Sequence, residues 1–219
     1  MSMSTKMEQP TRSKTPLLLI GGGGHCRSCI DVIEATEEYE IVGIVEADGA
    51  SSDNFTPYSI VGFDADLPEL LQQTPHCVIT IGQVKNASVR QKIFTELKAM
   101  QAILPTIVAP SAYVSPTAKL GEGTIVMHQA LVNGYAQVGD NCIVNSKALI
   151  EHDCVVANHC HVSTSAVLNG EVMLGEGCLI GSGSTLKQSV ELVDDVIIGA
   201  GSVVLNSINK LGTYCGVVK

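Results

Sequence analysis

Positive charge is scarce in this sequence. Lys and Arg together number 13 against 22 Asp and Glu, which gives a formal net charge of −9, and no run of basic residues is longer than two. Proteins that bind nucleic acids or anionic membrane surfaces carry the opposite balance, so we expect neither kind of partner. The partners that we expect are small molecules and further copies of the chain.

Long apolar runs are also lacking. No run approaches the roughly 18 residues that are needed to cross a bilayer, so we expect no membrane insertion. Residues 1–15 are polar and contain no apolar core of a signal peptide, and we expect them to form a disordered leader. With no signal peptide to export it, the protein is expected to be cytoplasmic.

A disulfide framework is a further feature that we do not expect. The eight cysteines lie in a chain without a secretion signal, where thiols normally stay reduced. Cys26 and Cys29 form a CxxC pair beside His25, but no second pair follows at the spacing of a zinc site. A thioredoxin-like redox pair is the alternative. We favour two structural cysteines on the first turns of a helix.

A six-residue repeat governs the chain from Val108 onward. The first position of seventeen consecutive hexads, from Val108 to Val204, is always Val, Leu or Ile, and the fifth is small or β-branched. An α-helix cannot use this period, because positions six apart turn away from each other at 3.6 residues per turn. Stacked short strands can, and a hexapeptide period is typical of a three-sided parallel β-helix. The repeat therefore predicts such a prism over residues 106–219.

Four cysteines occupy the fifth position of a hexad, which predicts that their thiols point into the prism: Cys142, Cys154, Cys160 and Cys178. Cys154 lies two residues from His152, and the two could be interpreted as a Cys–His nucleophile pair. An interior thiol is hard to ionise and lies away from substrate. We therefore do not expect cysteine catalysis.

Residues 16–105 have a different pattern, which predicts a Rossmann-like α/β domain. A short apolar strand over residues 17–20 runs into four glycines and His25, and a helix, two more strands and a last helix follow. We expect the helices over residues 26–35 and 86–100, with Val89, Ile93 and Leu97 on one face of the second. The further strands are expected over residues 40–45 and 77–81.

The glycine loop is a candidate phosphate site, because glycines let a phosphate approach the free N–H groups of the following helix. The dinucleotide motif GxGxxG fails in both registers, since Cys26 or Arg27 stands in place of the third glycine. Glu46 and Asp48 follow the second strand, where a ribose or base could be held. A nucleotide-sugar therefore fits better than NAD, and a purely structural glycine turn is the alternative.

The hexads resemble those of bacterial hexapeptide acyltransferases, as in LGEGTI (120–125), VGDNCI (138–143), LGEGCL (174–179) and IGAGSV (198–203). The resemblance implies a left-handed β-helix, a homotrimer, and active sites in the clefts between neighbouring prisms. Together with the GGGGH loop and the segment IEHDC (150–154), the sequence is similar to the sugar O- and N-acetyltransferases of bacterial surface-glycan synthesis.

This resemblance implies transfer from acetyl-CoA to the C4 amine of a UDP-linked 4-amino-4,6-dideoxy sugar, as in bacillosamine synthesis. Three alternatives stay open. The nucleotide could be GDP, the reaction could be O-acetylation of a sialic acid or another sugar, or the chain could be a non-catalytic scaffold that binds nucleotide-sugars. A zinc-binding histidine prism is not expected, because His128, His152, His159 and His161 do not repeat at coil spacing.

The resemblance assigns His152 as the general base for direct attack by the amine, with Asp153 as its orienting partner where the family usually has Glu. Coenzyme A would lie along the C-terminal coils, where small residues let its pantetheine arm approach the backbone, although coil corners need small residues too. We expect no metal, and we expect His128 and His159 at the surface. The candidate substrate-binding residues are Gly22, Gly24, His25, Glu46, Asp48, Gly82, Asn145 and His161, and the candidate coenzyme-binding residues are Gly170, Gly181, Ser182, Gly199 and Ala200.

Overall fold

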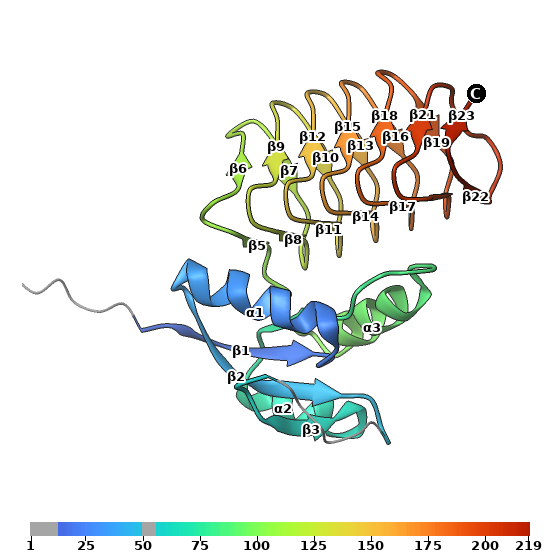
Figure 1. Cartoon of the computed structure of the whole chain (residues 1–219). Coiled ribbons are helices and arrows are strands. Elements are labelled where there is room, and N and C mark those ends of the chain that lie inside the picture. Colours follow the sequence, from blue (N-terminus) through green and yellow to red (C-terminus); the bar gives the residue numbers. More distant parts are fainter. Residues whose placement is uncertain (1–12, 50–55) are drawn as a thin grey trace, which may run out of the picture.

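The computed structural model describes residues 13–49 and 56–219. Figure 1 shows an α/β part below a column of stacked coils, with α1 lying between the sheet and the column. Of the leader expected over residues 1–15, residues 1–12 lie outside the described residues. Within the described ranges, every helix is too short or too polar to cross a membrane.

A four-stranded parallel sheet in the order β3-β2-β1-β4 is the centre of the N-terminal part. Its strands are β1 (Thr15–Ile20), β2 (Tyr39–Glu46), β3 (Ile60–Phe63) and β4 (Cys77–Ile79). The helices are α1 (Gly24–Thr36), η1 (Asp64–Asp66), α2 (Leu67–Gln73) and α3 (Ser88–Ala99). The carboxyl ends of parallel strands meet at one edge, which is where ligands bind in such sheets.

Both faces of this sheet are covered, which explains why β1 is a continuous apolar run. Leu17 and Leu19 pack with α1 and with the first coils of the prism, whereas Leu18 and Ile20 pack with α2 and α3. A strand that buries both faces has no polar face to alternate with. Cys26 and Cys29 lie on the first turns of α1 and are fully buried, as the structural interpretation predicts.

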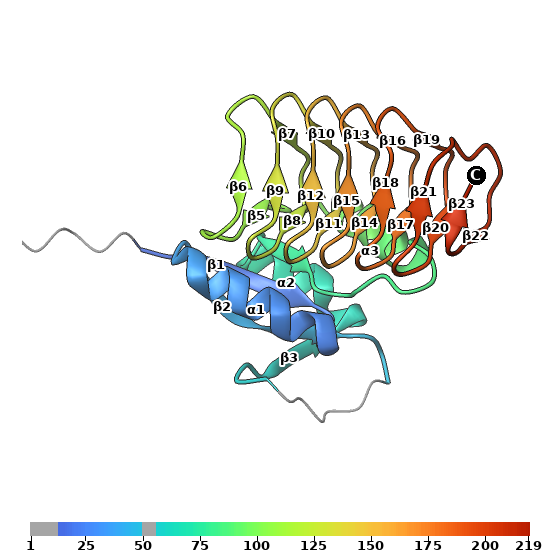
Figure 2. The ribbon, with the colours of Figure 1, turned by 45° about the horizontal axis from the view of Figure 1, so that its top comes forward.

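The C-terminal part is a prism with three sides, each a parallel sheet. Ile143 pairs with Ile125 and with His161, which lie 18 residues before and after it, so one coil is three hexads. Figure 2 shows the strands of successive coils in line along one side. The predicted fold class, a Rossmann-like α/β domain followed by a left-handed parallel β-helix, is confirmed.

The strands of the prism are two residues each. Side 1 consists of β5 (Ile107–Val108), β8 (Ile125–Val126), β11 (Ile143–Val144), β14 (His161–Val162), β17 (Leu179–Ile180), β20 (Ile197–Ile198) and β22 (Thr213–Tyr214). Side 2 consists of β6 (Tyr113–Val114), β9 (Leu131–Val132), β12 (Leu149–Ile150), β15 (Val167–Leu168), β18 (Thr185–Leu186), β21 (Val203–Val204) and β23 (Val217–Val218). Side 3 consists of β7 (Lys119–Leu120), β10 (Gln137–Val138), β13 (Val155–Val156), β16 (Met173–Leu174) and β19 (Glu191–Leu192).

The hexad positions have the roles that the repeat predicts. The first position supplies the second residue of each strand from β5 to β21, and these side chains fill the interior of the column. The cysteines at the fifth position are buried as predicted. The fourth position often turns the corner in the left-handed conformation, as Asn141, Asp153 and His159 do, which suits Asn, Asp, His and Gly better than other residues.

Two expectations about burial are wrong. Val89 is 56% exposed, and the residue that α3 buries beside Leu97 is Arg90, at 1% exposure. His159 is 9% exposed rather than at the surface, because α3 packs against its corner and Phe94 lies edge-on to its ring. Both errors have the same cause, which is that α3 lies against the prism.

Stability should depend on the interior column far more than on the outward residues of the same coils. Leu168→Ala removes a fully buried side chain and should cost about 2–5 kcal/mol of unfolding free energy. Gln137→Ala, at an exposed outward position, should cost about 0.5 kcal/mol or less. Urea unfolding at one fixed protein concentration measures both. Equal shifts in the two variants would contradict the assignment of inward and outward positions.

Candidate functional site

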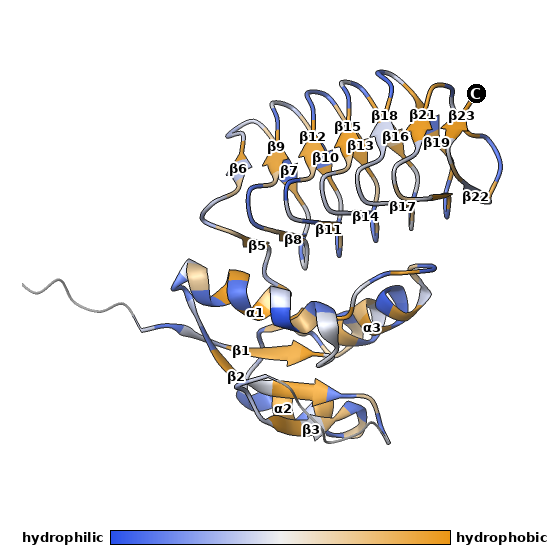
Figure 3. Cartoon of the chain, viewed as in Figure 1, coloured by the Kyte–Doolittle hydropathy of each residue, from blue (hydrophilic) through white to orange (hydrophobic). Residues whose placement is uncertain are grey.

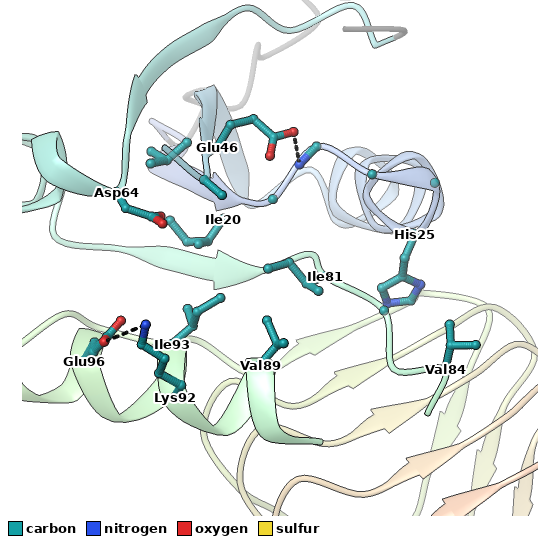
Figure 4. A pocket seen from close by; sticks show the side chains of 17 residues that line it. Ile20, His25, Glu46, Asp64, Ile81, Val84, Val89, Lys92, Ile93 and Glu96 are labelled. Atoms are coloured by element: carbon teal, nitrogen blue, oxygen red, sulfur yellow. Dashed lines mark hydrogen bonds and ion pairs between the residues drawn. The ribbon is translucent and has the colours of Figure 1, made fainter. Parts of the chain in front are cut away.

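A cavity of about 620 Å³ opens at the carboxyl edge of the N-terminal sheet. Figure 4 shows it between the glycine loop and α3, with His25 and Glu46 on one wall and Lys92, Ile93 and Glu96 on the other. The predicted residues Gly22, Gly24, His25, Glu46 and Gly82 all line it. Asp48 is not in the lining and contacts the site through a backbone hydrogen bond to Asp64.

Hydrogen bonds hold the glycine loop in place. The amide of Gly22 donates to Oε1 of Glu46 at 2.8 Å, and the hydroxyl of Thr80 donates to the carbonyl of Gly21 at 2.5 Å. A Cβ at position 22 would collide with the Glu46 carboxylate, so a larger residue there would displace this carboxylate and break its hydrogen bond to the loop. Among the described residues no side chain caps the start of α1, so its first N–H groups stay available to an anion.

Sequence reasoning missed the far wall of the cavity. Asp64, Lys92 and Glu96 line it together with Val89. Partial burial and the nearby carboxylates of Asp48 and Glu96 raise the pKa of Asp64. The sequence contained one indication of this wall, which is Val89. It is an apolar residue of the helix that is exposed because it faces the cavity.

His25 and His161 meet where the cavity wall joins the prism, with ring centroids 6.5 Å apart. Burial, followed by the positive charge of Arg90, lowers the pKa of His25 to about 4, and its Nε2 is buried without a hydrogen-bond partner among the described residues. Nδ1 of His161 donates to the carbonyl of Gln83 at 3.0 Å, and Nε2 accepts from the side-chain amide of Asn145 at 3.2 Å. His161 is therefore a neutral ring with both nitrogens engaged.

His152 lies on the corner between sides 2 and 3, with its side chain 51% exposed. Its Nδ1 is 2.9 Å from Oδ2 of Asp153, which leaves Nε2 directed away from that carboxylate. The hydrogen bond to Asp153, and then the negative charges of Asp153 and Glu151, raise the pKa of His152. This geometry suits a ring that takes up a proton at Nε2.

Gly170 lies one coil beyond His152 at the same corner. A Cβ at this position would come within 2.6 Å of both Nε2 and Cε1 of the imidazole. The ring of His152 thus lies over a residue that has no side chain to displace it.

The other coenzyme candidates lie at a different corner. Gly181, Ser182, Gly199 and Ala200 follow β17 and β20, at the corner between sides 1 and 2, and Asn145 lies at that corner too. A Cβ on Gly181 would lie 2.5 Å from the backbone nitrogen of Ala200, so coil stacking by itself explains that glycine. A single chain therefore does not bring these residues together with His152.

Comparison with known proteins agrees with both halves of this arrangement. Residues 16–97 match the family described as the PglD N-terminal domain. PerB from Caulobacter crescentus, solved with CoA and GDP-perosamine, is 30% identical with a TM-score of 0.84 over 93% of this chain and 95% of that chain. The chain belongs to the hexapeptide-repeat sugar N-acetyltransferases.

A second member of this family matches nearly the whole length of the chain. The acetyltransferase domain of PglB from Neisseria gonorrhoeae FA1090, solved with acetyl coenzyme A, is 30% identical with a TM-score of 0.82, covering 93% of this chain and 97% of that one. WeeI from Acinetobacter baumannii AYE shares the fold at 16% identity and a TM-score of 0.58. None of the curated proteins that were compared matches the sequence. The acyltransferase activity expected from the sequence is thus confirmed.

In this acyltransferase the titration of His152 should follow its neighbour. Asp153→Asn removes the first cause of the raised pKa, so the pKa of His152 should fall and the ring should become neutral at a lower pH. Histidine resonances followed by NMR over a pH series measure the change. Glu122→Gln, at another corner, should leave the pKa of His152 unchanged. A pKa that stays the same in Asp153→Asn would show that the hydrogen bond is absent in solution.

Proposed function

We propose that this protein transfers the acetyl group of acetyl-CoA to the C4 amine of a UDP-linked 4-amino-4,6-dideoxy sugar, as in bacillosamine synthesis. The observation that carries the proposal is the cavity behind the glycine loop, built on the same fold as two acetyltransferase relatives. Of these, PerB is bound to CoA and a nucleotide-sugar, and the PglB domain is bound to acetyl coenzyme A. Residues 16–105 would bind the nucleotide-sugar and residues 106–219 would carry the transfer. A cytoplasmic location belongs to the same proposal.

GDP is the second candidate for the nucleotide. PerB from Caulobacter crescentus is bound to GDP-perosamine, and its identity to this chain equals that of the PglB domain. The sugar end of the proposal is the same in both cases. Gly22, Gly24, His25, Glu46 and Gly82 would hold the nucleotide-sugar in the cavity.

A homotrimer is part of the proposal, because it would unite the two corners. In a ring of three prisms, the His152 corner of one chain can face the corner between sides 1 and 2 of its neighbour. Figure 3 shows the strands of side 2 as mostly hydrophobic, and of their outward residues Tyr113, Val203 and Val217 are exposed, so this side has apolar surface for such contacts. The outward residues Leu131, Leu149 and Val167 are half-buried in the single chain.

His152 would act as the general base. Asp153 holds the proton on Nδ1, so Nε2 can accept a proton from the sugar amine as its nitrogen attacks the thioester carbonyl. The C–S bond then breaks, the acetyl group stays on nitrogen, and the proton held by His152 leaves with the thiolate. No acyl-enzyme is needed, and burial raises the pKa of Cys154 to about 11, which disfavours it as a nucleophile.

The test is a product assay with three acceptors. The purified protein is incubated with acetyl-CoA and, separately, a UDP-4-amino sugar, a GDP-4-amino sugar and free sialic acid. We expect thiol release and a mass gain of one acetyl group on the UDP-4-amino sugar. Acetylation of sialic acid alone would support O-acetylation instead. No thiol release with any acceptor would indicate a scaffold.

A further inference from the structure

Arg90 on α3 is a buried cation whose hydrogen-bond acceptors are all neutral. Its Nη1 donates to the carbonyls of Ile81 at 2.7 Å and Ile79 at 3.3 Å. Its Nη2 donates to Oδ1 and the carbonyl oxygen of Asn141, at 2.6 and 3.0 Å. Arg90 is 1% exposed, and none of the ion pairs among the described residues includes it.

Such an arrangement is costly for a residue that serves packing alone. A buried ion without a countercharge loses its hydration, and apolar residues of similar volume often replace buried charges without loss of stability. Nε of Arg90 has no hydrogen-bond partner in residues 13–49 and 56–219, so this part of the chain does not fully satisfy the guanidinium. The positive charge itself is the feature that needs an explanation.

The charge lies directly behind the wall of the cavity. Ile81, whose carbonyl accepts a hydrogen bond from Arg90, lines the cavity. Val89, which precedes Arg90 on α3, lines it too. The described residues of the lining contribute three carboxylates, Glu46, Asp64 and Glu96, and Lys92 as the one cation. A diphosphate in this cavity would meet the first N–H groups of α1 and Lys92, but also these three carboxylates, so positive potential from outside the lining would strengthen its binding.

The positive charge of Arg90 also acts on the two histidines of the junction. Burial is the first cause of the lowered pKa of both His25 and His161, and the positive charge of Arg90 adds to it in each case. A charge inside a protein acts on groups that it does not touch, because the effective dielectric constant there is lower than in water.

We propose that Arg90 is a positioning residue that provides the fixed positive potential for the diphosphate of the nucleotide-sugar, acting through the Ile81 wall without touching the ligand. The inference rests on the proposed function in taking a nucleoside diphosphate as the ligand. Asn141, from the prism, holds the guanidinium against the cavity wall. The neutrality of Asn141 leaves the charge of Arg90 uncompensated.

The decisive variant is Asn141→Asp, which keeps the acceptor for Nη2 and supplies the missing countercharge. It loses the hydrogen bonds that Nδ2 of Asn141 donates to the carbonyl of Arg90 and to Nδ1 of His159, so an unchanged melting temperature is required of it. Asp also tolerates the left-handed conformation at this position. Binding of UDP and GDP is measured by calorimetry at low and high salt, and KM is measured for both substrates. We expect the better nucleotide to bind about tenfold more weakly at low salt, with a flatter salt dependence and an unchanged KM for acetyl-CoA.

Two further variants separate charge from structure. Arg90→Gln should reproduce the loss of nucleotide affinity if it folds, as melting temperature and molar mass will show. Lys98→Gln removes an equal charge from the same helix at an exposed ion pair with Glu122, and it should leave nucleotide affinity unchanged.

Wild-type affinity and salt dependence in Asn141→Asp would overturn the inference, and so would equal changes in both KM values. Failure of UDP and GDP to bind the wild-type protein would overturn it as well. If a nucleotide binds in an Arg90-dependent way but no amino sugar is acetylated, the proposed function fails and the inference stands.

Discussion

Replacing His152 with alanine should lower kcat by about 10²–10⁴-fold, the range that a general base contributes. The expectation follows from a half-exposed ring whose Nδ1 faces Asp153 and whose Nε2 stays available for a proton. KM for both substrates should change little, because the ring takes up the proton during the reaction and does not contribute to substrate binding. Initial rates of thiol release over a range of both substrates measure the effect.

The control for this variant is His128→Ala. His128 also lies on a prism corner with a carboxylate partner at 2.8 Å, but this partner is Asp31 of α1, and His128 is not among the candidate site residues. Its loss should leave kcat within about threefold of wild type, well below the loss expected for a general base. A similarly small change in His152→Ala, with melting temperature and molar mass unchanged, would remove His152 from the role of base.

The pH profile gives the same assignment a second test. A base works only in its neutral form, so kcat should rise with pH through the pKa of His152, which Asp153 raises above its ordinary value. In Asp153→Asn the rising limb should move to lower pH as that pKa falls. A limb that stays in place would mean that another group titrates.

The prism could be predicted because its information is local and repeated. The place of a residue within its hexad determines whether its side chain points inward. The burial of four cysteines follows from their fifth position alone: Cys142, Cys154, Cys160 and Cys178. The His152–Asp153 pair could also be predicted from local sequence, because the two residues are adjacent. The contact of Gly170 with His152 follows from their 18-residue spacing once the coil length is known.

The wall formed by α3 could not be predicted in this way. The helix pattern puts Val89 on the apolar face with Leu97, and such a face normally packs against the core, whereas the residue that α3 buries beside Leu97 is Arg90. Arg90 is buried because Asn141, 51 residues further along the chain, accepts its hydrogen bonds, and no local pattern encodes such a partner. The burial of His159 and the position of Asp64 at the cavity likewise depend on which elements pack together.

Gly170→Ala should lower kcat by about tenfold to a hundredfold without destabilising the protein. The new methyl group would occupy the space under the imidazole of His152, and a catalytic group displaced by about 1 Å can lose that much rate. Stability should hold because the atoms in the way belong to the end of an exposed side chain, which can swing aside. Steady-state kinetics and melting temperature measure the two effects.

The matched control is Gly134→Ala, one coil before His152 at the same corner. A Cβ there would meet Oγ1 of Thr117 at 3.4 Å, an ordinary contact, so rate and stability should both stay near wild type. If Gly170→Ala keeps full activity, catalysis does not require the imidazole of His152 to lie directly over position 170. If it unfolds the prism, Gly170 serves coil stacking, as Gly181 does, rather than the base.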